Sequence, residues 1–198
     1  ANMKYATAAA VAVEACAEDT EGQTCYICME GDTKEGLVRG CACHTTEGFV
    51  HISCMAEQAK ILVAEGLANR VGHEAKRALW ARWYSCSLCE KHYHGVVHCA
   101  LGWACWKTYV GRPEGDWTRQ SAMQQLGNGL FSAKRHEELL SVRKIEFSIL
   151  RRLGVSGEHM LAMKGNLAGT YYLLGRYRGP AVEPRRPLRF SEAHGRGK

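Results

Sequence analysis

The segment Cys25–Cys89 contains four short motifs, CYIC (25–28), CAC (41–43), HISC (51–54) and CSLC (86–89). They supply eight candidate metal ligands in four pairs, namely Cys25, Cys28, Cys41, Cys43, His51, Cys54, Cys86 and Cys89. A structural zinc ion takes four cysteine or histidine ligands in a tetrahedron, so eight ligands suit two ions. One CxxC pair alone could be a redox motif, whereas four successive pairs indicate a metal site. The sequence therefore predicts two Zn²⁺ ions.

The composition of the chain favours a folded protein in a reducing compartment. It has 198 residues, of which 46% are hydrophobic and ten are cysteine. The opening residues lack the features of a secretory signal, and the best candidate for a membrane span, residues 95–111, is interrupted by His98 and Lys107. Paired thiols in such a compartment bind metal more often than they form disulfides. The expected location is the cytoplasm, with the nucleus as the alternative because of the Pro-Arg-Arg-Pro run at 184–187.

The positive charge of the chain is concentrated near its C-terminal end. Residues 176–198 contain seven basic and two acidic residues, which leaves the preceding part at +1 out of a total of +6. Nucleic-acid binding needs clustered lysine and arginine to neutralise phosphates, so no nucleic-acid partner is predicted. Residues 180–198 are expected to form a basic disordered tail, which could instead contact an acidic partner.

The order of the eight ligands resembles the RING-CH (RING-variant) zinc finger of the membrane-associated RING-CH ubiquitin ligases. The histidine stands fifth, one residue separates Cys41 from Cys43, and seven separate Cys43 from His51. The resemblance implies a small α+β fold with cross-braced binding, in which alternate pairs share an ion. It assigns one zinc to Cys25, Cys28, His51 and Cys54 and the other to Cys41, Cys43, Cys86 and Cys89.

A plant homeodomain (PHD) finger has the same ligand order and is the nearest alternative. It usually has more residues between the third and fourth ligands, and fewer before the histidine, than this chain has. Its aromatic residue normally lies two positions before the last ligand pair, where this chain has Tyr84, with Trp83 one position further back. The ligand spacing therefore favours RING-CH.

The resemblance also implies a binding partner for the finger. RING-type ligases supply no catalytic nucleophile and act by holding a ubiquitin-conjugating enzyme, charged with ubiquitin, in a reactive conformation. The groove for that enzyme would consist of Ile27, Trp83 and Leu88. Alternatively, Ile27 and Leu88 fill the small core and Trp83 covers the zinc sulfurs. Ser87 and Glu90 stand where many active RING fingers carry a proline and a basic residue. A ubiquitin-protein ligase or adaptor is therefore one hypothesis, and a noncatalytic, PHD-like peptide reader is the other.

The gap between Cys54 and Cys86 is longer than in most RING-CH fingers, and its apolar periodicity predicts a helical insertion over residues 55–83. The finger is then expected to span residues 21–95, after an N-terminal segment over 1–20. A connecting helix is predicted over 96–112, with Cys99 and Cys105 packed in the core. Four histidines outside the motifs are spare ligand candidates, namely His44, His92, His94 and His98.

Helical periodicity continues over residues 113–179. The expected buried stripes are Met123, Leu126 and Leu130; Val142, Ile145, Ile149 and Leu153; and Met160, Met163, Leu167, Tyr171 and Leu174. LGNGLFSAKRH, from Leu126, aligns with LAGTYYLLGRY, from Leu167, and pairs the small residues Gly127 and Ala168. This echo resembles tetratricopeptide repeats (TPR) of the long kinesin-light-chain type. It implies an all-α, TPR-like segment of helical hairpins that binds a protein substrate or partner, with an unrelated three-helix bundle as the alternative.

Overall fold

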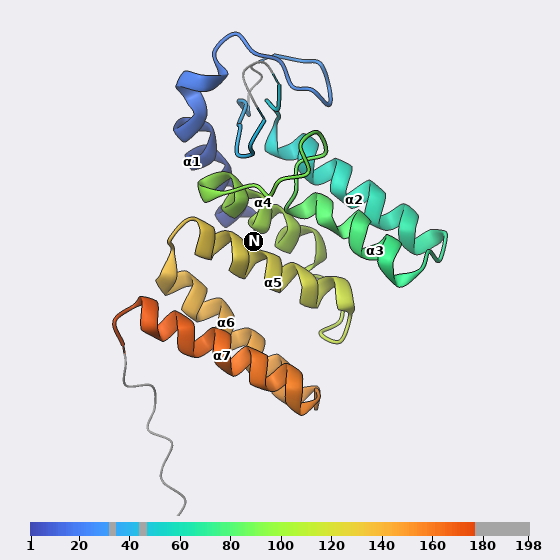
Figure 1. Ribbon diagram of the computed structural model, residues 1–198, viewed down its shortest axis with the longest axis vertical. Helices are drawn as coiled ribbons and strands as arrows, with labels where there is room; N and C mark the ends of the chain where they lie inside the picture. Colours follow the sequence, from blue (N-terminus) through green and yellow to red (C-terminus); the bar gives the residue numbers. More distant parts are fainter. Residues whose placement is uncertain (32–34, 44–46, 177–198) are drawn as a thin grey trace, which may run out of the picture.

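The computed structural model describes residues 1–31, 35–43 and 47–176, and these residues are largely helical. The helices are α1 (Asn2–Thr20), α2 (Ile52–Ala68), α3 (His73–Trp80), the 3₁₀-helix η1 (Ala81–Trp83), α4 (Gly95–Tyr109), α5 (Trp117–Ser132), α6 (His136–Arg152) and α7 (Gly157–Leu173). Figure 1 shows the loops of the finger at one end of the molecule and α5, α6 and α7 layered at the other, with α4 between them. The tail expected over 180–198 lies outside the described residues.

The β component expected of the finger is small. Within the described residues, it consists of two isolated antiparallel bridges, one between Val38 and Val50 and one between Ser85 and His92. Reciprocal backbone hydrogen bonds of 2.9 and 3.0 Å join Val38 and Val50. The chain turns at each ligand pair, which leaves too few consecutive residues for a longer ladder. The finger is therefore made of loops and helices.

The helix α4 lies at the centre of the structure and packs against α1, α2 and α5. Ten of its residues are buried, which explains why it is apolar on nearly all sides. Cys99 and Cys105 are 2% and 0% exposed, which confirms the prediction that these thiols are packed in the core. Across the part of the chain that the structure describes, no helix combines the length and the apolar character needed to cross a membrane.

Two glycines bring the backbones of α4 and α5 into contact. A Cβ atom added at Gly129 would lie 2.7 Å from a carbonyl oxygen of α4, and one added at Gly102 would lie 3.0 Å from the carbonyl oxygen of Gln125. Any larger residue at these positions would push the two helices apart. The small residue singled out in the sequence, Gly127, instead faces α6, where an added Cβ would lie 3.2 Å from Cζ of Arg143.

The buried face of α6 differs from the predicted stripe, although the stripe predicted on α5 is buried. Ile145 and Leu153 are 55% and 41% exposed, so their assignment to the core was wrong. The buried residues of α6 are Leu139, Leu140, Arg143, Glu146, Ile149 and Leu150. Arg143 and Glu146 form a buried ion pair of 3.0 Å on this face. Apolar periodicity in the sequence does not identify this buried face of α6, because two of its residues are charged.

Candidate metal centre

The first and last ligand pairs are held by turns with the same backbone hydrogen bonds. The amide of Cys25 donates to the carbonyl of Glu30 at 2.8 Å, and the amide of Cys86 donates to that of Lys91 at 2.9 Å. In each turn the residue after the second cysteine has a positive φ, 62° at Met29 and 57° at Glu90. This left-handed residue reverses the chain, so that both cysteines of a pair point to one side. We call these two turns, 25–30 and 86–91, the first and last knuckles.

Cys25, Cys28, His51 and Cys54 form the first cluster, in which all four ligand atoms lie within 4.8 Å of one another. Nδ1 of His51 is 3.5 Å from Sγ of Cys28 and 3.7 Å from Sγ of Cys54. Zinc bonds to sulfur and nitrogen imply ligand separations of about 3.5–3.8 Å in a tetrahedron. The donor set and its spacing therefore fit one zinc ion.

The ring of His51 is oriented by a second contact. Its Nε2 lies 3.2 Å from the carbonyl oxygen of Gly31, which can only accept a hydrogen bond, so Nε2 carries the proton. The lone pair of Nδ1 is then directed at the cysteine sulfurs, as a zinc ligand requires. His51 also stands at the N-cap of α2, and Cys54 lies in the first turn of that helix.

Cys41, Cys43, Cys86 and Cys89 form the second cluster, again with all four sulfurs within 4.8 Å of one another. The sulfurs of Cys43 and Cys86 are 3.7 Å apart, which suits two ligands of one zinc and is far too long for a disulfide. A Cβ atom at Gly48, whose φ is +89°, would lie 2.7 Å from Cβ and 3.1 Å from Sγ of Cys43. Gly48 therefore leaves the room in which the second cluster assembles.

The clustered thiols differ in pKa because they hydrogen-bond to one another and to the backbone. The hydrogen bond from Cys41 lowers the pKa of Cys86 to about 4, and the same bond raises the pKa of Cys41. Burial raises the pKa of Cys54 to about 12. Burial also acts to raise the pKa of Cys25, but backbone N–H groups outweigh it and lower the value to about 7. A zinc ion would displace the protons from those ligand thiols that are still protonated. Its positive charge would offset the negative charge of the resulting thiolates.

The two clusters interleave along the chain, because the first cluster takes the first and third pairs and the second takes the second and fourth. The three other cysteines, Cys16, Cys99 and Cys105, are buried outside both clusters. Among the spare histidines, His92 packs edge-on against Tyr84, and burial lowers the pKa of His98 to about 4. His94 belongs to neither cluster, and His44 lies outside the described residues.

The three residues expected in the enzyme groove lie in different environments. Leu88 in the last knuckle is 47% exposed, Ile27 in the first knuckle is half-buried, and Trp83 is fully buried. The hydroxyl groups of Tyr26 and Ser87 are 3.1 Å apart, so the two knuckles lie side by side. Trp83 instead packs in an aromatic cluster, with its ring 6.4 Å from that of Trp80 and 5.8 Å from that of Tyr109.

Sequence reasoning missed two residues that shape the site. Gly31 supplies the carbonyl that orients His51, and Gly48 makes room beside Cys43. In the sequence, each of them is only a glycine near a ligand pair. This does not distinguish them from the many glycines of this chain that have no atom within 4 Å of their Cβ position. The contacts that distinguish these two glycines depend on loops that come together only in the folded protein.

Comparison with known protein families finds one match, in which the RING-variant domain covers residues 25–66. The matched residues hold six of the eight ligands and end within α2, before the last pair. The searches of curated proteins and of solved structures gave no match. Residues 25–66 are thus similar to the RING-variant domain, and the two Cys/His groups of the described chain could each bind one zinc ion.

Proposed function

We propose that this protein is a ubiquitin-protein ligase or ligase adaptor, in which the finger docks a ubiquitin-conjugating enzyme and the helical half binds a substrate. The observation that carries the proposal is the pairing of the first and last knuckles through Tyr26 and Ser87. In the proposal, the partly buried Ile27 and the exposed Leu88, one from each of these adjacent knuckles, form the docking surface. A scaffold of this kind accelerates transfer by positioning the charged enzyme and needs no catalytic residue of its own.

The two zinc clusters would make this docking surface rigid. Each knuckle is fixed at its base by two ligands, so Ile27 and Leu88 lose little conformational freedom when a partner binds. Trp83 has no exposed surface and would support the groove from below, where its ring contacts Trp80 and Tyr109. An exposed apolar residue over a rigid base is the arrangement typical of interface hot spots.

The helical half is the region to which the proposal assigns substrate binding. Ala122 and Gly129 are buried on α5, and Met163 and Thr170, at the positions 41 residues later, are buried on α7. These two pairs are buried alike, whereas the small pair of the echo is not, because Gly127 is buried on α5 and Ala168 is exposed on α7. An open recess of about 480 Å³ lies between α5, α6 and α7, and it could receive a substrate segment.

A noncatalytic zinc-finger interaction module is the second candidate, and the burial of Trp83 favours it. Only two of the three expected groove residues reach the surface, so the apolar area offered to a conjugating enzyme is smaller than the sequence predicted. Glu90, next to the last ligand, is exposed and adds a negative charge beside the groove. Such a surface would instead read a peptide, as the PHD-like alternative proposes.

Self-ubiquitination assays with a panel of conjugating enzymes test the proposal. We expect activity with at least one enzyme, and we expect Leu88→Ala and Ile27→Ala to lose most of it while retaining two zinc ions. Ile61→Ala on α2 is a matched control, because Ile61 is 46% exposed and Leu88 is 47% exposed. If the wild-type chain is inactive with every enzyme, the ligase proposal fails and the noncatalytic module remains.

A further inference from the structure

A solvent-open recess lies where α3 of the insertion meets the beginning of α5. Its volume is about 450 Å³, within the range of sites that bind ligands or peptide side chains. The helix α3 contributes His73, Lys76, Arg77 and Trp80, which lie at intervals of three and four residues and therefore on one face. Tyr84 and Trp117 complete the walls. We call this recess the α3–α5 groove.

The floor of the α3–α5 groove is aromatic and rigid. The rings of Trp80 and Trp117 are 5.3 Å apart, and on its other side Trp80 packs 5.4 Å from Tyr109. Trp80 is only 9% exposed, whereas Trp117 is 40% exposed. A large apolar surface fixed in this way can receive an aromatic or aliphatic side chain at a small cost in conformational entropy.

The rim of the groove carries positive charge without a counterion. The lining residues include a lysine, an arginine and a histidine but no acidic residue. Within the described ranges, Lys76 and Arg77 take part in no ion pair. The nearby carboxylate of Asp116 accepts hydrogen bonds from Thr118 and is paired with Arg112, so it does not neutralise the rim.

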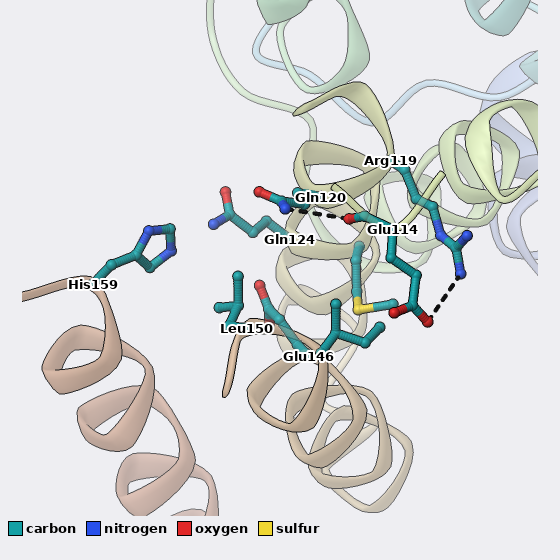
Figure 2. A pocket seen from close by; sticks show the side chains of 9 residues that line it. Glu114, Arg119, Gln120, Gln124, Glu146, Leu150 and His159 are labelled. Atoms are coloured by element: carbon teal, nitrogen blue, oxygen red, sulfur yellow. Dashed lines mark hydrogen bonds and ion pairs between the residues drawn. The ribbon is translucent and has the colours of Figure 1, made fainter. Parts of the chain in front are cut away.

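A much smaller recess, lined by residues of α5, α6 and the start of α7, including Arg119, Glu146 and His159, offers a comparison. Figure 2 shows Arg119 beside Glu114 in this recess, where Glu146 also pairs with Arg143, and the volume of the recess is about 20 Å³. Such a space holds about one water molecule. The α3–α5 groove differs in both respects, because it is large and its charges are unpaired.

We propose that the α3–α5 groove binds a short acidic segment of a partner protein that carries one aromatic or large aliphatic side chain. The apolar side chain would pack against Trp80 and Trp117, and the flanking carboxylates would contact Lys76 and Arg77. Charge complementarity selects this occupant, since an unpaired basic rim around an aromatic floor attracts acidic segments and repels basic ones. This inference goes beyond the proposed ligase function and does not depend on it.

Fluorescence anisotropy of labelled heptapeptides with the full, zinc-loaded chain tests the proposal. The probes are peptides with three acidic residues on each side of a central tryptophan, leucine or alanine, and a basic counterpart around tryptophan. We expect saturable binding of the acidic tryptophan and leucine peptides, binding about tenfold weaker for alanine, and none for the basic peptide. Equal binding of all the acidic peptides, or no saturable binding, would overturn the proposal.

Variants locate the binding site on the chain. Arg77→Glu and Lys76→Glu, on a solvent-exposed helix face, should each weaken binding of the acidic tryptophan peptide about tenfold, and Trp117→Ala should do the same by removing the anchor contact. Lys164→Glu makes the same charge change on an exposed position of α7 and should leave the affinity unchanged. An equal loss in Lys164→Glu would show a non-specific charge effect and refute the proposal.

A nucleic acid is the competing occupant of a basic, aromatic groove. A labelled oligothymidine therefore serves as a second probe in the same assay. Tighter binding of this probe than of the acidic tryptophan peptide, with loss in Arg77→Glu and Trp117→Ala, would refute the peptide proposal. Ubiquitination assays play no part in these measurements, so a failure here leaves the ligase proposal untouched.

Discussion

The finger and the helical half of this protein are ordered by different means. In the finger, loops with little regular structure converge on two clusters of four ligands. In the helical half, α4, α5, α6 and α7 pack side by side, and α4 and α5 touch at Gly102 and Gly129. One apolar core runs from the finger loops through α4 to α5, but the ligand clusters of the described chain lie in the finger, so its loops have a second source of order. The comparison predicts that the two regions respond differently to the same perturbation.

Metal removal should give the largest difference. Structural zinc contributes about 10–16 kcal/mol per ion, so chelation should unfold the finger while α5, α6 and α7 remain helical. Hydrogen exchange measured by mass spectrometry should show protection lost over residues 25–93 and retained over 117–173. Metal analysis should give two zinc ions per chain, with loss of metal and of cooperative folding in Cys41→Ser and Cys86→Ser.

Cys105→Ala serves as the control for metal removal, because Cys105 is buried outside both clusters. This variant should retain two zinc ions even if its stability falls. Equal loss of protection in both halves after chelation would mean that the two regions fold as one unit, and the comparison would be wrong.

Gly48→Ala tests the crowding of the second cluster. A Cβ atom there would lie 2.7 Å from Cβ of Cys43, so we expect zinc affinity at this cluster to fall about 10–100-fold, measured by chelator competition. Gly22→Ala is the matched control, since Gly22 also has a positive φ, +70°, but no atom within 4 Å. It should cost about 1–2 kcal/mol of strain without changing zinc affinity. Equal zinc affinities in the two variants would contradict the steric argument.

Gly129→Ala tests the helical half. The added methyl would meet the backbone of α4, so we expect the free energy of unfolding to fall by about 1–3 kcal/mol in urea titrations. Gly169→Ala on α7 is the control, because no atom lies within 4 Å of its Cβ position. Alanine is the better helix former, so this variant should be neutral or gain up to about 1 kcal/mol. A stable Gly129→Ala variant would mean that α4 and α5 are not in backbone contact.

Asp116→Ala should give the smallest effect. Asp116 caps α5 by accepting hydrogen bonds from the amide and hydroxyl groups of Thr118 at 2.8 and 2.6 Å. Loss of such a cap costs about 1 kcal/mol in unfolding free energy. Asp116→Asn is the matched control, because it keeps an acceptor oxygen but not the charge.

The same cap has a defined pH dependence. Burial acts to raise the pKa of Asp116, but hydrogen bonds from Thr118 and Arg112 outweigh it and lower the pKa below the usual 3.8. Because the pKa is lowered in the folded state, the ionised Asp116 stabilises the protein at neutral pH. This stabilisation is lost as the pH falls below 3.8 and through the folded-state pKa. The difference in stability between wild type and Asp116→Asn should therefore vanish in acid. If the stability difference between wild type and Asp116→Asn grew as the pH fell, the pKa of Asp116 would be raised in the folded protein and not lowered.

The eight ligands could be predicted from the sequence because a knuckle is a local structure. Cys25 and Cys28, or Cys86 and Cys89, converge through hydrogen bonds within six consecutive residues. Their division into two clusters followed from resemblance to a family, since spacing alone does not say which pairs meet. The described structure groups the ligands in the same way.

The parts that the sequence did not reveal depend on contacts between distant segments. Gly48 is restricted by Cys43 only after the loop closes, and Trp83 could not be placed inside or outside the finger core without its aromatic neighbours. The face of α6 was assigned by apolar spacing, yet Arg143 and Glu146 neutralise each other on the buried side. Periodicity cannot detect a buried ion pair.

The second cluster takes two ligands from before the α2–α3 hairpin and two from after it. A protease that cuts the exposed turn at residues 69–72 would therefore produce two polypeptides that share one coordination sphere. Zinc would then link two fragments that also pack together through the contacts of α4 with α1 and α2. Cleavage at this hairpin would therefore leave a nicked finger whose second zinc site is completed by both fragments.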